Sequence, residues 1–424
     1  MISIISIVAL LLLLVLGVPM VAALMFAVSF NFVMSGQWSM TIPQTMISGV
    51  SQFTLIALPL FVLSGTLMNA GGISGRLFDF ARSLVGWMRG GLAQVNILTS
   101  IFFGGMIGSS TADLAGSGSI LIPAMKKEGY SAEISAAVSA SSSGVGPLIP
   151  PSSPMILYSA VTGTSLGALF LAGLIPGLIL GGAFMVLVSF LSWRNNWARH
   201  GRFAAAEVVR SGKRALLAFG VPAIIVGGLV AGVFTPSEGG AFAVVYALVL
   251  SMFVYRTLDL RAVYRAFVAA LMLTGELLVI VALSFALGSS LSSAQVPQVL
   301  ADLIEVLTTG DSMFWTLAIL MILAIVAGMF LDPLIPVLVP VILPTLIMYD
   351  INLIHFGVLM VMAVVIGQLT PPLAIALIIT GRIAQTDQLR IFAANMPFLI
   401  LILGVTVMLM LFPALATWLP SLMR

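Results

Sequence analysis

Long apolar segments follow one another along this chain from end to end, and no long polar stretch separates them. Each runs to about 17 to 25 residues, which is the length that an α-helix needs to cross a lipid bilayer. Of the 424 residues, 61% are hydrophobic and only 7% are charged, too few charges to cover a water-soluble fold of this size. The sequence therefore predicts an all-α polytopic membrane protein, embedded in a lipid bilayer, with no separate soluble domain.

The first two apolar segments leave an alternative open. Residues 1–16 lack the basic start and the small-residue cleavage site of a signal peptide, so we interpret them as a retained helix. Residues 1–34 form either two short spans or one long helix kinked at Gly17 to Pro19. We favour two spans, because residues 218–234 and 237–255 are separate spans in the second half of the chain.

The residue types present exclude several classes of function. The chain has no cysteine, so thiol catalysis, thiolate metal sites and disulfides are excluded. His200 and His355 are the only histidines, and they are too isolated to predict a zinc site. The isoelectric point is about 9.4, but the basic residues lie in short loops, where they orient a membrane protein rather than bind nucleic acid.

Two stretches, residues 107–151 and 328–372, resemble each other. A constant shift aligns Pro123 with Pro344, Gly146 with Gly367, Pro150 with Pro371 and Pro151 with Pro372. Because these residues fall at the same places relative to the apolar segments, we predict an internal repeat. Its halves are residues 1–205 and 206–424, and they are expected to insert in opposite orientations, as an inverted repeat.

Arginine and lysine set the orientation, because cytoplasmic loops are enriched in them. Basic loops, predicted to lie inside, are residues 76–89, 126–127, 194–214, 256–265 and 382–390. Loops without basic residues, predicted to lie outside, are 35–50, 160–167, 235–240 and 292–312. The arrangement that satisfies both sets has ten spans and two hairpins, with both termini outside.

Residues 91–127 lie between two loops that are both predicted inside. They are too few for two full spans, which need about 40 residues, so they predict a re-entrant helical hairpin with a polar tip near the middle of the bilayer. Residues 313–349 predict a second hairpin, which enters from the outside and turns at Leu331 to Pro333.

After each hairpin comes a span that glycine and proline interrupt. Residues 131–160 are broken at 144–151, and residues 353–381 are broken at 367–372. Proline removes a backbone donor and disfavours helical geometry in the residue before it, so carbonyls and helix ends are freed. Such backbone persists at membrane depth only where protein or a wet cavity surrounds it, and paired broken helices mark the binding site of a secondary transporter.

The candidate site joins these tips and breaks. A small organic anion needs hydrogen-bond donors and sodium needs oxygen ligands, which helix ends, hydroxyls and freed carbonyls supply. The candidates in the first half are Ser109, Ser110, Thr111, Asp113, Ser117 and Ser119 at the tip, with Ser142, Ser143, Gly146 and Pro150 at the break. Those in the second half are Asp332, Gly367, Thr370 and Pro371. A single serine or threonine more often bonds to its own helix, so the prediction rests on the cluster.

Four acidic residues and one arginine each admit two interpretations. Asp113 and Asp332 are predicted at membrane depth, where an ionisable residue indicates function. The alternative is a cap on a half-helix, which we weigh equally for Asp113 and favour for Asp332. Glu238 and Glu276 are placed at or near the ends of spans, where they either reach the interface or couple transport to protons, and we favour the first interpretation. Arg382 is either an inside anchor or a ligand for a substrate carboxylate.

At these residues the chain resembles the large membrane subunit of the tripartite ATP-independent periplasmic (TRAP) transporters. The resemblance covers nearly the full chain and is carried, in the family's order, by GSSTADLAGSGSILIPAMKKEGY, SSSGVGPLIPPSSPMILY, GVFTPSEGGAFAVVYAL, and GMFLD followed by IGQLTPP. It implies an elevator-type carrier in the bacterial inner membrane, driven by a sodium gradient. It also implies two partners, a soluble periplasmic substrate-binding protein and a small four-helix membrane subunit.

The resemblance further implies roles for the candidate residues. A small organic anion, such as a sialic acid or a dicarboxylate, is expected between the two tips, at Ser109, Ser110, Thr111, Asp113 and Arg382. Sodium is the expected coupling ion, and no other cofactor is implied. Its ligands are expected where each hairpin meets the following break, at Ser117, Ser119, Ser142, Ser143, Gly146, Pro150, Gly328, Asp332, Gly367, Thr370 and Pro371.

Three positions depart from the pattern of that family. A Gly-Ile-Asp turn is more usual where residues 349–351 stand, an asparagine where Ala363 stands, and a glycine where Ala374 stands. Because of these departures, the substrate of this chain does not follow from its relatives.

Three other functions compete with this interpretation. A related sodium and organic anion symporter that works alone differs by having no small subunit. An intramembrane hydrolase would use Ser109 or Ser143 as its nucleophile, but no histidine or lysine is placed to activate either hydroxyl. A passive channel is disfavoured, because hairpins that enter from both sides indicate an occluded site. We therefore expect a transporter and not an enzyme.

Overall fold

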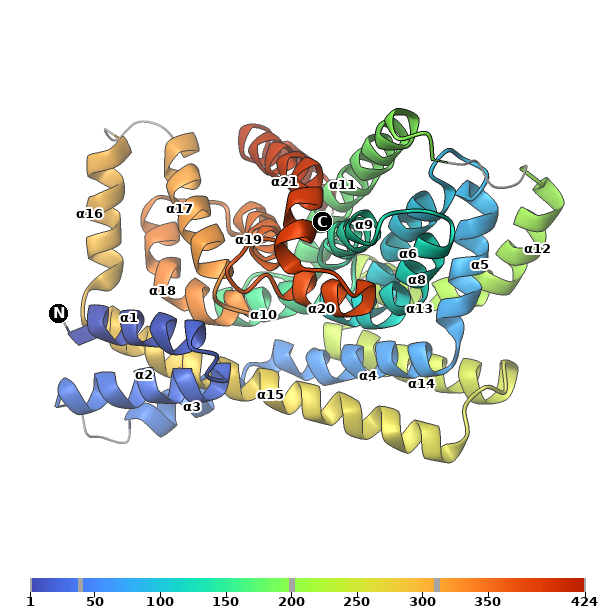
Figure 1. Cartoon of the computed structure of the whole chain (residues 1–424). Helices are drawn as coiled ribbons and strands as arrows, with labels where there is room; N and C mark the ends of the chain where they lie inside the picture. The colour runs from blue at the N-terminus through green and yellow to red at the C-terminus, as the bar shows by residue number, and fades with distance from the viewer. Residues whose placement is uncertain (1, 37–40, 198–202, 309–312, 423–424) are drawn as a thin grey trace.

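The computed structural model describes residues 2–36, 41–197, 203–308 and 313–422. The described residues form α-helices with short 3-10 and π turns, and none of them forms a β-strand (Figure 1). The prediction of an all-α protein is confirmed. Six of the helices are long and apolar enough to cross a membrane, and seven shorter apolar helices accompany them in the described part of the chain.

The first two apolar segments are separate helices. α1 (Ile2–Val15) ends before Gly17, which adopts a φ of +81°, and α2 (Met20–Met34) begins after Pro19. The two helices pack against each other, and the amide nitrogen of Asn31 donates a 3.1 Å hydrogen bond to the Ser6 hydroxyl. The favoured interpretation of two separate helices is confirmed, and the alternative of one kinked helix was wrong, because the positive φ of Gly17 ends α1 and the chain turns before Pro19.

One layer of the molecule is organised around α15 (Leu260–Ser293), which contacts α2, α3 (Thr41–Val50) and α4 (Ala57–Ala70) (Figure 1). A 3-10 turn, η1 (Phe53–Ile56), leads into α4, and α14 (Pro236–Val249) packs on α4. Glu238 lies in a capping box at the start of α14, because its carboxylate accepts from the Thr235 backbone N–H at 2.7 Å. This capping contact fixes the local structure at the start of the helix. Glu238 is exposed there, and its interpretation as a side chain that reaches the interface stays a prediction.

A helical hairpin occupies residues 91–127. Its first arm is α6 (Gly91–Ile107), and its second arm runs without interruption through α7 (Ser110–Asp113), the π turn η2 (Leu114–Gly118) and α8 (Ser119–Lys127). Gly108, with a φ of +60°, makes the turn between the arms. The following α9 (Ala132–Ser143) and α10 (Ser153–Thr162) are separated by non-helical chain and the 3-10 turn η3 (Gly146–Leu148).

The second half repeats this order of elements. α17 (Met313–Gly328) and α18 (Leu334–Met348) form a hairpin, and α19 (Leu353–Gln368) is separated from α20 (Ile375–Ala384) by a break. Ala374 stands at that break with a φ of +43°, in the left-handed region that favours glycine. This backbone geometry explains why a glycine suits the position better than the alanine that departs from the family pattern.

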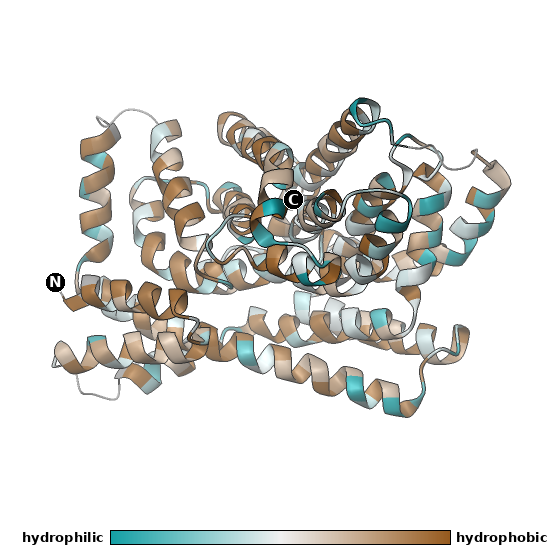
Figure 2. Cartoon of the chain, in the orientation of Figure 1, coloured by the Kyte–Doolittle hydropathy of each residue, from teal (hydrophilic) through white to brown (hydrophobic). Residues whose placement is uncertain are grey.

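The remaining helices surround these elements. They are α5 (Ile73–Val85), α11 (Leu166–Arg194), α12 (Ala205–Ala215), η4 (Leu216–Phe219), α13 (Gly220–Val230), η5 (Leu250–Val254), α16 (Val296–Thr308), α21 (Gln388–Leu411), α22 (Ala414–Thr417) and η6 (Pro420–Leu422). α11 and α21 pack on each other, and α21 also packs on α9 and α19. Hydrophilic residues gather at helix ends and on α5 and α12, whereas apolar residues dominate most other helices (Figure 2).

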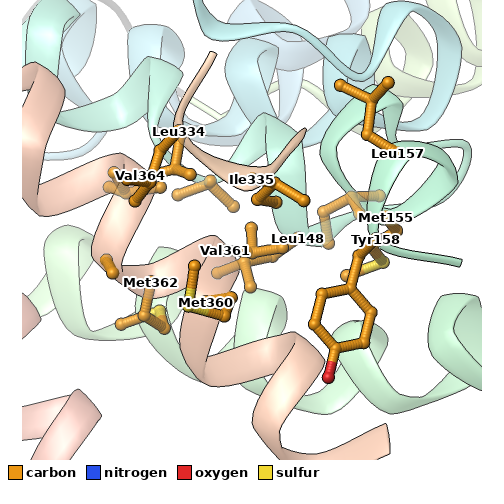
Figure 3. Packing of buried hydrophobic residues seen from close by; sticks show 14 of the residues in the cluster. Leu148, Met155, Leu157, Tyr158, Leu334, Ile335, Met360, Val361, Met362 and Val364 are labelled. Atoms are coloured by element: carbon orange, nitrogen blue, oxygen red, sulfur yellow. The ribbon is translucent and has the colours of Figure 1, made fainter. Parts of the chain in front are cut away.

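The buried core joins the two halves of the chain beside the breaks (Figure 3). α10 packs on α18 and α19, so Leu148 and Met155 of the first half lie among Ile335 and Val361 of the second. The Tyr158 hydroxyl donates a 2.9 Å hydrogen bond to the Leu353 carbonyl. The two interrupted helices are therefore held in one rigidly packed region.

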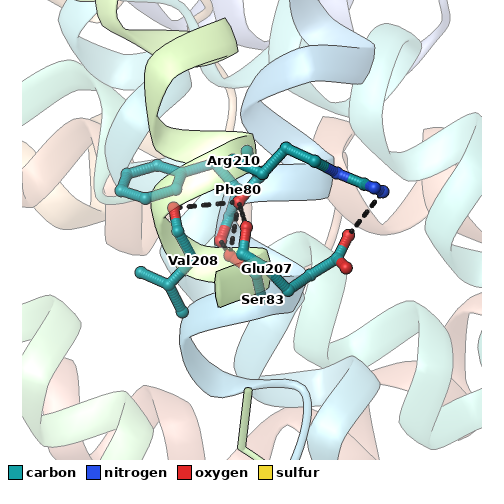
Figure 4. A network of polar contacts seen from close by, with 6 residues as sticks. Phe80, Ser83, Glu207, Val208 and Arg210 are labelled. Atoms are coloured by element: carbon teal, nitrogen blue, oxygen red, sulfur yellow. Dashed lines mark hydrogen bonds and ion pairs between the residues drawn. The ribbon is translucent and has the colours of Figure 1, made fainter. Parts of the chain in front are cut away.

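α5 and α12 meet through a small polar network (Figure 4). The hydroxyls of Ser83 and Ser211 lie 2.8 Å apart, and each also lies 2.7 Å from a carbonyl oxygen of its own helix. Arg210 forms a surface ion pair with Glu207 at 3.3 Å, which contributes at most about 1 kcal/mol. Both helices carry basic residues, so this network joins two segments that are predicted to lie on the cytoplasmic side.

The orientation of the chain is testable at two exposed residues. Ala206 lies in the first turn of α12 in the basic region, and Ser293 ends α15 in the region without basic residues. We expect a cysteine at Ser293 to react with a membrane-impermeant thiol reagent in intact cells, and a cysteine at Ala206 to react only after lysis. The chain has no native cysteine to confuse the labelling. The reverse pattern would overturn the predicted topology.

Candidate functional site

A cavity of about 300 Å³ lies where the hairpins and the interrupted helices meet α4 and α15. α4 and α15 contribute Val62, Gly65, Thr66, Asn69, Leu273, Glu276, Leu277 and Ile280. The two hairpin turns contribute Ser109, Ser110, Thr111, Ala112, Asp332, Pro333, Leu334 and Ile335, and the interrupted helices contribute Pro147, Ser153, Pro154, Leu157, Val364 and Gln368. Small ligands bind in concave, mostly apolar spaces of this size with a few polar groups, so this cavity is the candidate binding site.

The first hairpin rests directly on the first break. A Cβ on Gly108 would lie 2.0 Å from the Pro151 carbonyl oxygen, and the backbone N–H of Ser153 donates a 3.3 Å hydrogen bond to the Gly108 carbonyl. One turn earlier, a Cβ on Gly104 would lie 2.8 Å from the Gly146 Cα. Only glycine allows this approach of two backbones, so the sequence fixes the hairpin turn against the break.

The second hairpin touches the second break in the same manner. A Cβ on Gly367 would lie 2.4 Å from the Gly328 carbonyl oxygen. Beside this contact is a space of about 10 Å³, lined by Gly328, Met329, Phe330, Leu331, Asp332, Gly367, Gln368, Leu373, Ala374 and Ile375. A space of that volume holds about one water-sized particle. Gly328, Asp332 and Gly367, predicted as sodium ligands, are therefore brought together around a small void.

Three residues with hydroxyl groups at the first hairpin turn, Ser109, Ser110 and Thr111, line the main cavity. Ser110 is 3% exposed, lines the cavity, and its hydroxyl has no hydrogen-bond partner among the described residues. The hydroxyls of Ser109 and Thr111 lie 3.0 Å apart. A buried hydroxyl without a partner costs free energy, so the Ser110 hydroxyl is a candidate to bind a ligand.

Asp113 lies beneath this turn and does not line the cavity. Its Oδ1 accepts a 2.6 Å hydrogen bond from the Ser117 hydroxyl, whereas its buried Oδ2 has no partner among the described residues. The capping interpretation of Asp113 was wrong, because it accepts no hydrogen bond from the backbone at the start of α7. The π turn at residues 114–118 follows at once, and such turns often occur at functional sites.

The other predicted ligands of the first half are distributed differently. Ser142 is buried and bonds to Asn96, and Ser143 donates to the Ala140 carbonyl at 2.8 Å. Ser119 is exposed and donates to the Gly116 carbonyl at 2.7 Å. Pro150 is buried at the break, beside α6. Of these predicted ligands, only Pro150, which belongs to the break, lies against the first hairpin.

In the second half, Asp332 lines both the main cavity and the small void. Its Oδ2 lies 3.5 Å from the Gln368 amide nitrogen, a long hydrogen bond. The capping interpretation was wrong here too, because Pro333 is the N-cap residue of α18 and no side-chain cap is present. Thr370 donates to the Ile366 carbonyl at 2.7 Å, and Pro371 is half-buried at the break.

Arg382 lies in a different place from the other predicted substrate ligands. It lines a surface pocket with residues of α20 and the loop that follows, and it is not among the residues that line the main cavity. Glu276, in contrast, lies in the middle of α15 and lines the cavity. Its placement near the end of a span was wrong, because α15 continues through the predicted boundary.

Sequence reasoning also missed α4 as a wall of the site. Asn69 and Thr66 line the cavity from that helix. Asn69 lies in an apolar segment, and a polar amide in such a segment could have indicated that α4 contributes to the site. Its Oδ1 accepts a 2.8 Å hydrogen bond from the Ser74 hydroxyl, which leaves its amide nitrogen to donate.

A cavity enclosed by helical hairpins and interrupted helices is the arrangement of a membrane transport protein. The sequence matches the model of the family described as "Tripartite ATP-independent periplasmic transporter, DctM component" over residues 7–415. The chain therefore belongs to this family, as a large permease subunit, and it is a transporter component rather than an enzyme.

Relatives match over most of the chain. It is 36% identical to the sialic acid TRAP transporter large permease protein SiaM of Vibrio cholerae, covering 96% of this chain and 95% of that protein. It is 35% identical to the C4-dicarboxylate TRAP transporter large permease protein DctM of Pseudomonas aeruginosa, covering 87% and 86%. It is 32% identical to the sialic acid permease SiaT of Haemophilus influenzae, covering 96% of this chain but 66% of that protein.

A solved structure shares the fold at low sequence identity. The Alcanivorax borkumensis YdaH transporter has a TM-score of 0.60 and 15% identity, over 87% of each chain. At that identity the likeness concerns the fold alone, and it identifies the fold as that of a membrane transporter.

Proposed function

We propose that this permease carries a small organic anion into the cell across the bacterial inner membrane, coupled to sodium. The observation that carries the proposal is the cavity in which both hairpin turns and both interrupted helices meet α4 and α15. Substrate in this cavity contacts the hairpins and interrupted helices on one side and α4 and α15 on the other. An alternating-access carrier moves two such bodies against each other. Sialic acids and C4-dicarboxylates, named for the relatives, are the reference substrates.

The two halves of the chain form an inverted repeat in this proposal. Each half has a hairpin followed by an interrupted helix, and each pair meets through glycines, Gly104 with Gly146 and Gly328 with Gly367. The hairpins and interrupted helices form the moving body of an elevator, and the layer of α4 and α15 forms its fixed wall. The cavity lies between the two, where substrate is exposed to either side as the body moves.

Sodium binds where each hairpin meets its break. In the first half, the buried Oδ2 of Asp113, which has no partner in the described part of the chain, supplies a charged oxygen next to the hairpin turn. In the second half, the void is lined by Gly328, Gly367 and Asp332, whose backbone carbonyls and carboxylate are the available oxygens. Carbonyl and carboxylate oxygens are the ligands of sodium at broken helices.

Two partners complete the transporter. A soluble periplasmic binding protein delivers substrate, and a small membrane subunit packs on the fixed layer. The description of the family as tripartite supports both partners. Copurification of a small membrane subunit with the full chain distinguishes this arrangement from a symporter of related fold that works alone.

The coupling ion is tested with proteoliposomes. We expect the chain, reconstituted with its small subunit and a loaded binding protein, to take up substrate only when sodium is higher outside than inside. The oxygen-rich contacts between hairpins and breaks are the reason for this expectation. Potassium replaces sodium in the control. Undiminished uptake in sodium-free buffer, driven by a proton gradient or by ATP, would reject sodium coupling.

A further inference from the structure

The main cavity carries negative charge without a positive partner. Among the described residues that line it, Glu276 and Asp332 are acidic, and none is lysine, arginine or histidine. Arg382, the predicted partner of a substrate carboxylate, lines a different pocket. A substrate with only negative charges would therefore enter beside like charges, which is unfavourable where water screens weakly.

Glu276 is the acidic side chain of the cavity that is exposed and has no partner among the described residues. It lies in the middle of the apolar helix α15, and Leu273, Leu277 and Ile280 line the cavity around it. It makes no hydrogen bond or ion pair with the described residues. An ionisable residue at membrane depth is costly unless it is paired or reaches a wet cavity, and it marks a functional site by default.

The negative charge of Asp332 has other groups to compensate it. Gln368 lies within a long hydrogen bond of its carboxylate, and it borders the void proposed for sodium. Glu276 belongs to α15, outside both proposed sodium positions. We therefore expect the positive charge that pairs with Glu276 to come from the substrate.

The cavity also supplies donors for a carboxylate. Ser110 is 3% exposed, and its hydroxyl has no partner among the described residues. Ser109 and Thr111 carry two more hydroxyls at the same turn. These donors lie on the hairpin turn, whereas Glu276 lies on α15. One site thus presents hydrogen-bond donors on the hairpin and an unpaired carboxylate on the fixed layer.

We propose that the substrate of this permease is an organic acid that also carries a protonated amine, as an α-amino acid does. Its ammonium group pairs with Glu276, and its carboxylate accepts hydrogen bonds from Ser110 and the neighbouring hydroxyls. The inference rests on the proposed function and narrows it from organic anions to zwitterions. A site with an unpaired carboxylate favours a substrate that carries the amine, because an analogue without it leaves Glu276 without a group of opposite charge in the cavity.

The test compares compounds that differ only in the amine. The full chain is purified in detergent with sodium chloride, and its melting temperature is measured with alanine and lactate, aspartate and malate, and glutamate and 2-hydroxyglutarate. We expect the largest rise in melting temperature from an amino compound. In Glu276→Gln the apparent affinity for that compound falls by at least about 10-fold, because a charged pair is lost, and its advantage over the hydroxy analogue disappears.

Matched variants make the result specific to the cavity. Glu305→Gln changes the same residue type on α16, where the side chain is exposed and does not line the cavity, and it keeps the amine preference. Glu276→Asp retains the charge and keeps the preference with weaker binding. The melting temperature of each variant without ligand shows that it is folded.

Three outcomes would overturn the proposal that the substrate is a zwitterion. They are a larger shift with a hydroxy acid, no shift with any amino compound, and an amine preference that survives in Glu276→Gln. Failure of the proposed function has a different signature, in which the shift persists unchanged when potassium replaces sodium. A sodium-dependent shift with a hydroxy acid keeps the coupled organic anion carrier and rejects only the zwitterion.

Discussion

Gly367→Ala is expected to abolish uptake and to lower the stability of the chain. The added Cβ would lie 2.4 Å from the Gly328 carbonyl oxygen and 2.9 Å from the Gly328 Cα. Both clashing atoms are backbone atoms, so no side-chain rotation relieves the contact, and the second hairpin must move away from its break. We expect a loss near the upper end of the overpacking range, about 3 kcal/mol. Thermal unfolding in detergent and uptake in proteoliposomes measure the two effects.

Gly404→Ala is the matched control for this prediction. Gly404 lies inside α21, and a Cβ there has no other atom within 4 Å. Alanine in a helix interior is more stable than glycine by about 0.5–1 kcal/mol, so this variant is expected to melt at or above the wild-type temperature. Uptake should be unchanged. Wild-type melting and uptake in Gly367→Ala would show that the second hairpin does not rest on the break as described.

Asp113→Asn is expected to leave the fold intact and to reduce sodium-driven uptake by about 100-fold. The amide oxygen of asparagine still accepts the hydrogen bond that Ser117 donates to Oδ1, so the local structure is retained. The second oxygen, Oδ2, is buried and has no partner among the residues that the structure describes, and the substitution replaces it by an uncharged amide nitrogen. Loss of a charged ligand costs about 3 kcal/mol, which corresponds to about 100-fold in ion binding.

The sodium dependence of uptake separates an ion ligand from a structural residue. We expect Asp113→Asn to need about 100-fold more sodium for half-maximal uptake, with an unchanged melting temperature in the absence of sodium. Asp302→Asn, an exposed position on α16, provides the control and should behave as the wild type. Normal sodium dependence in Asp113→Asn would place the ion elsewhere and leave Asp113 with only its bond to Ser117.

The candidate site was only partly accessible to sequence reasoning. Glycine and proline indicate where a helix stops, because they act on the backbone next to them, and α9 accordingly ends at Ser143 and α10 resumes at Ser153. The direction of a side chain depends on packing between distant segments. For this reason Ser110 and Ser119, neighbours in one predicted cluster, differ in the structure, since one is buried at the cavity and the other is exposed.

Composition and local backbone rules determined that this chain is an all-helical membrane protein with interrupted helices. An apolar surface has no other stable solvent than lipid, and in lipid the backbone must satisfy its own hydrogen bonds. Only the tertiary structure decided that α4 and α15 close the cavity and that Glu276 lines it. It also decided that Arg382 lies in another pocket, because contacts between segments far apart in the sequence are set by three-dimensional packing, which no local pattern records.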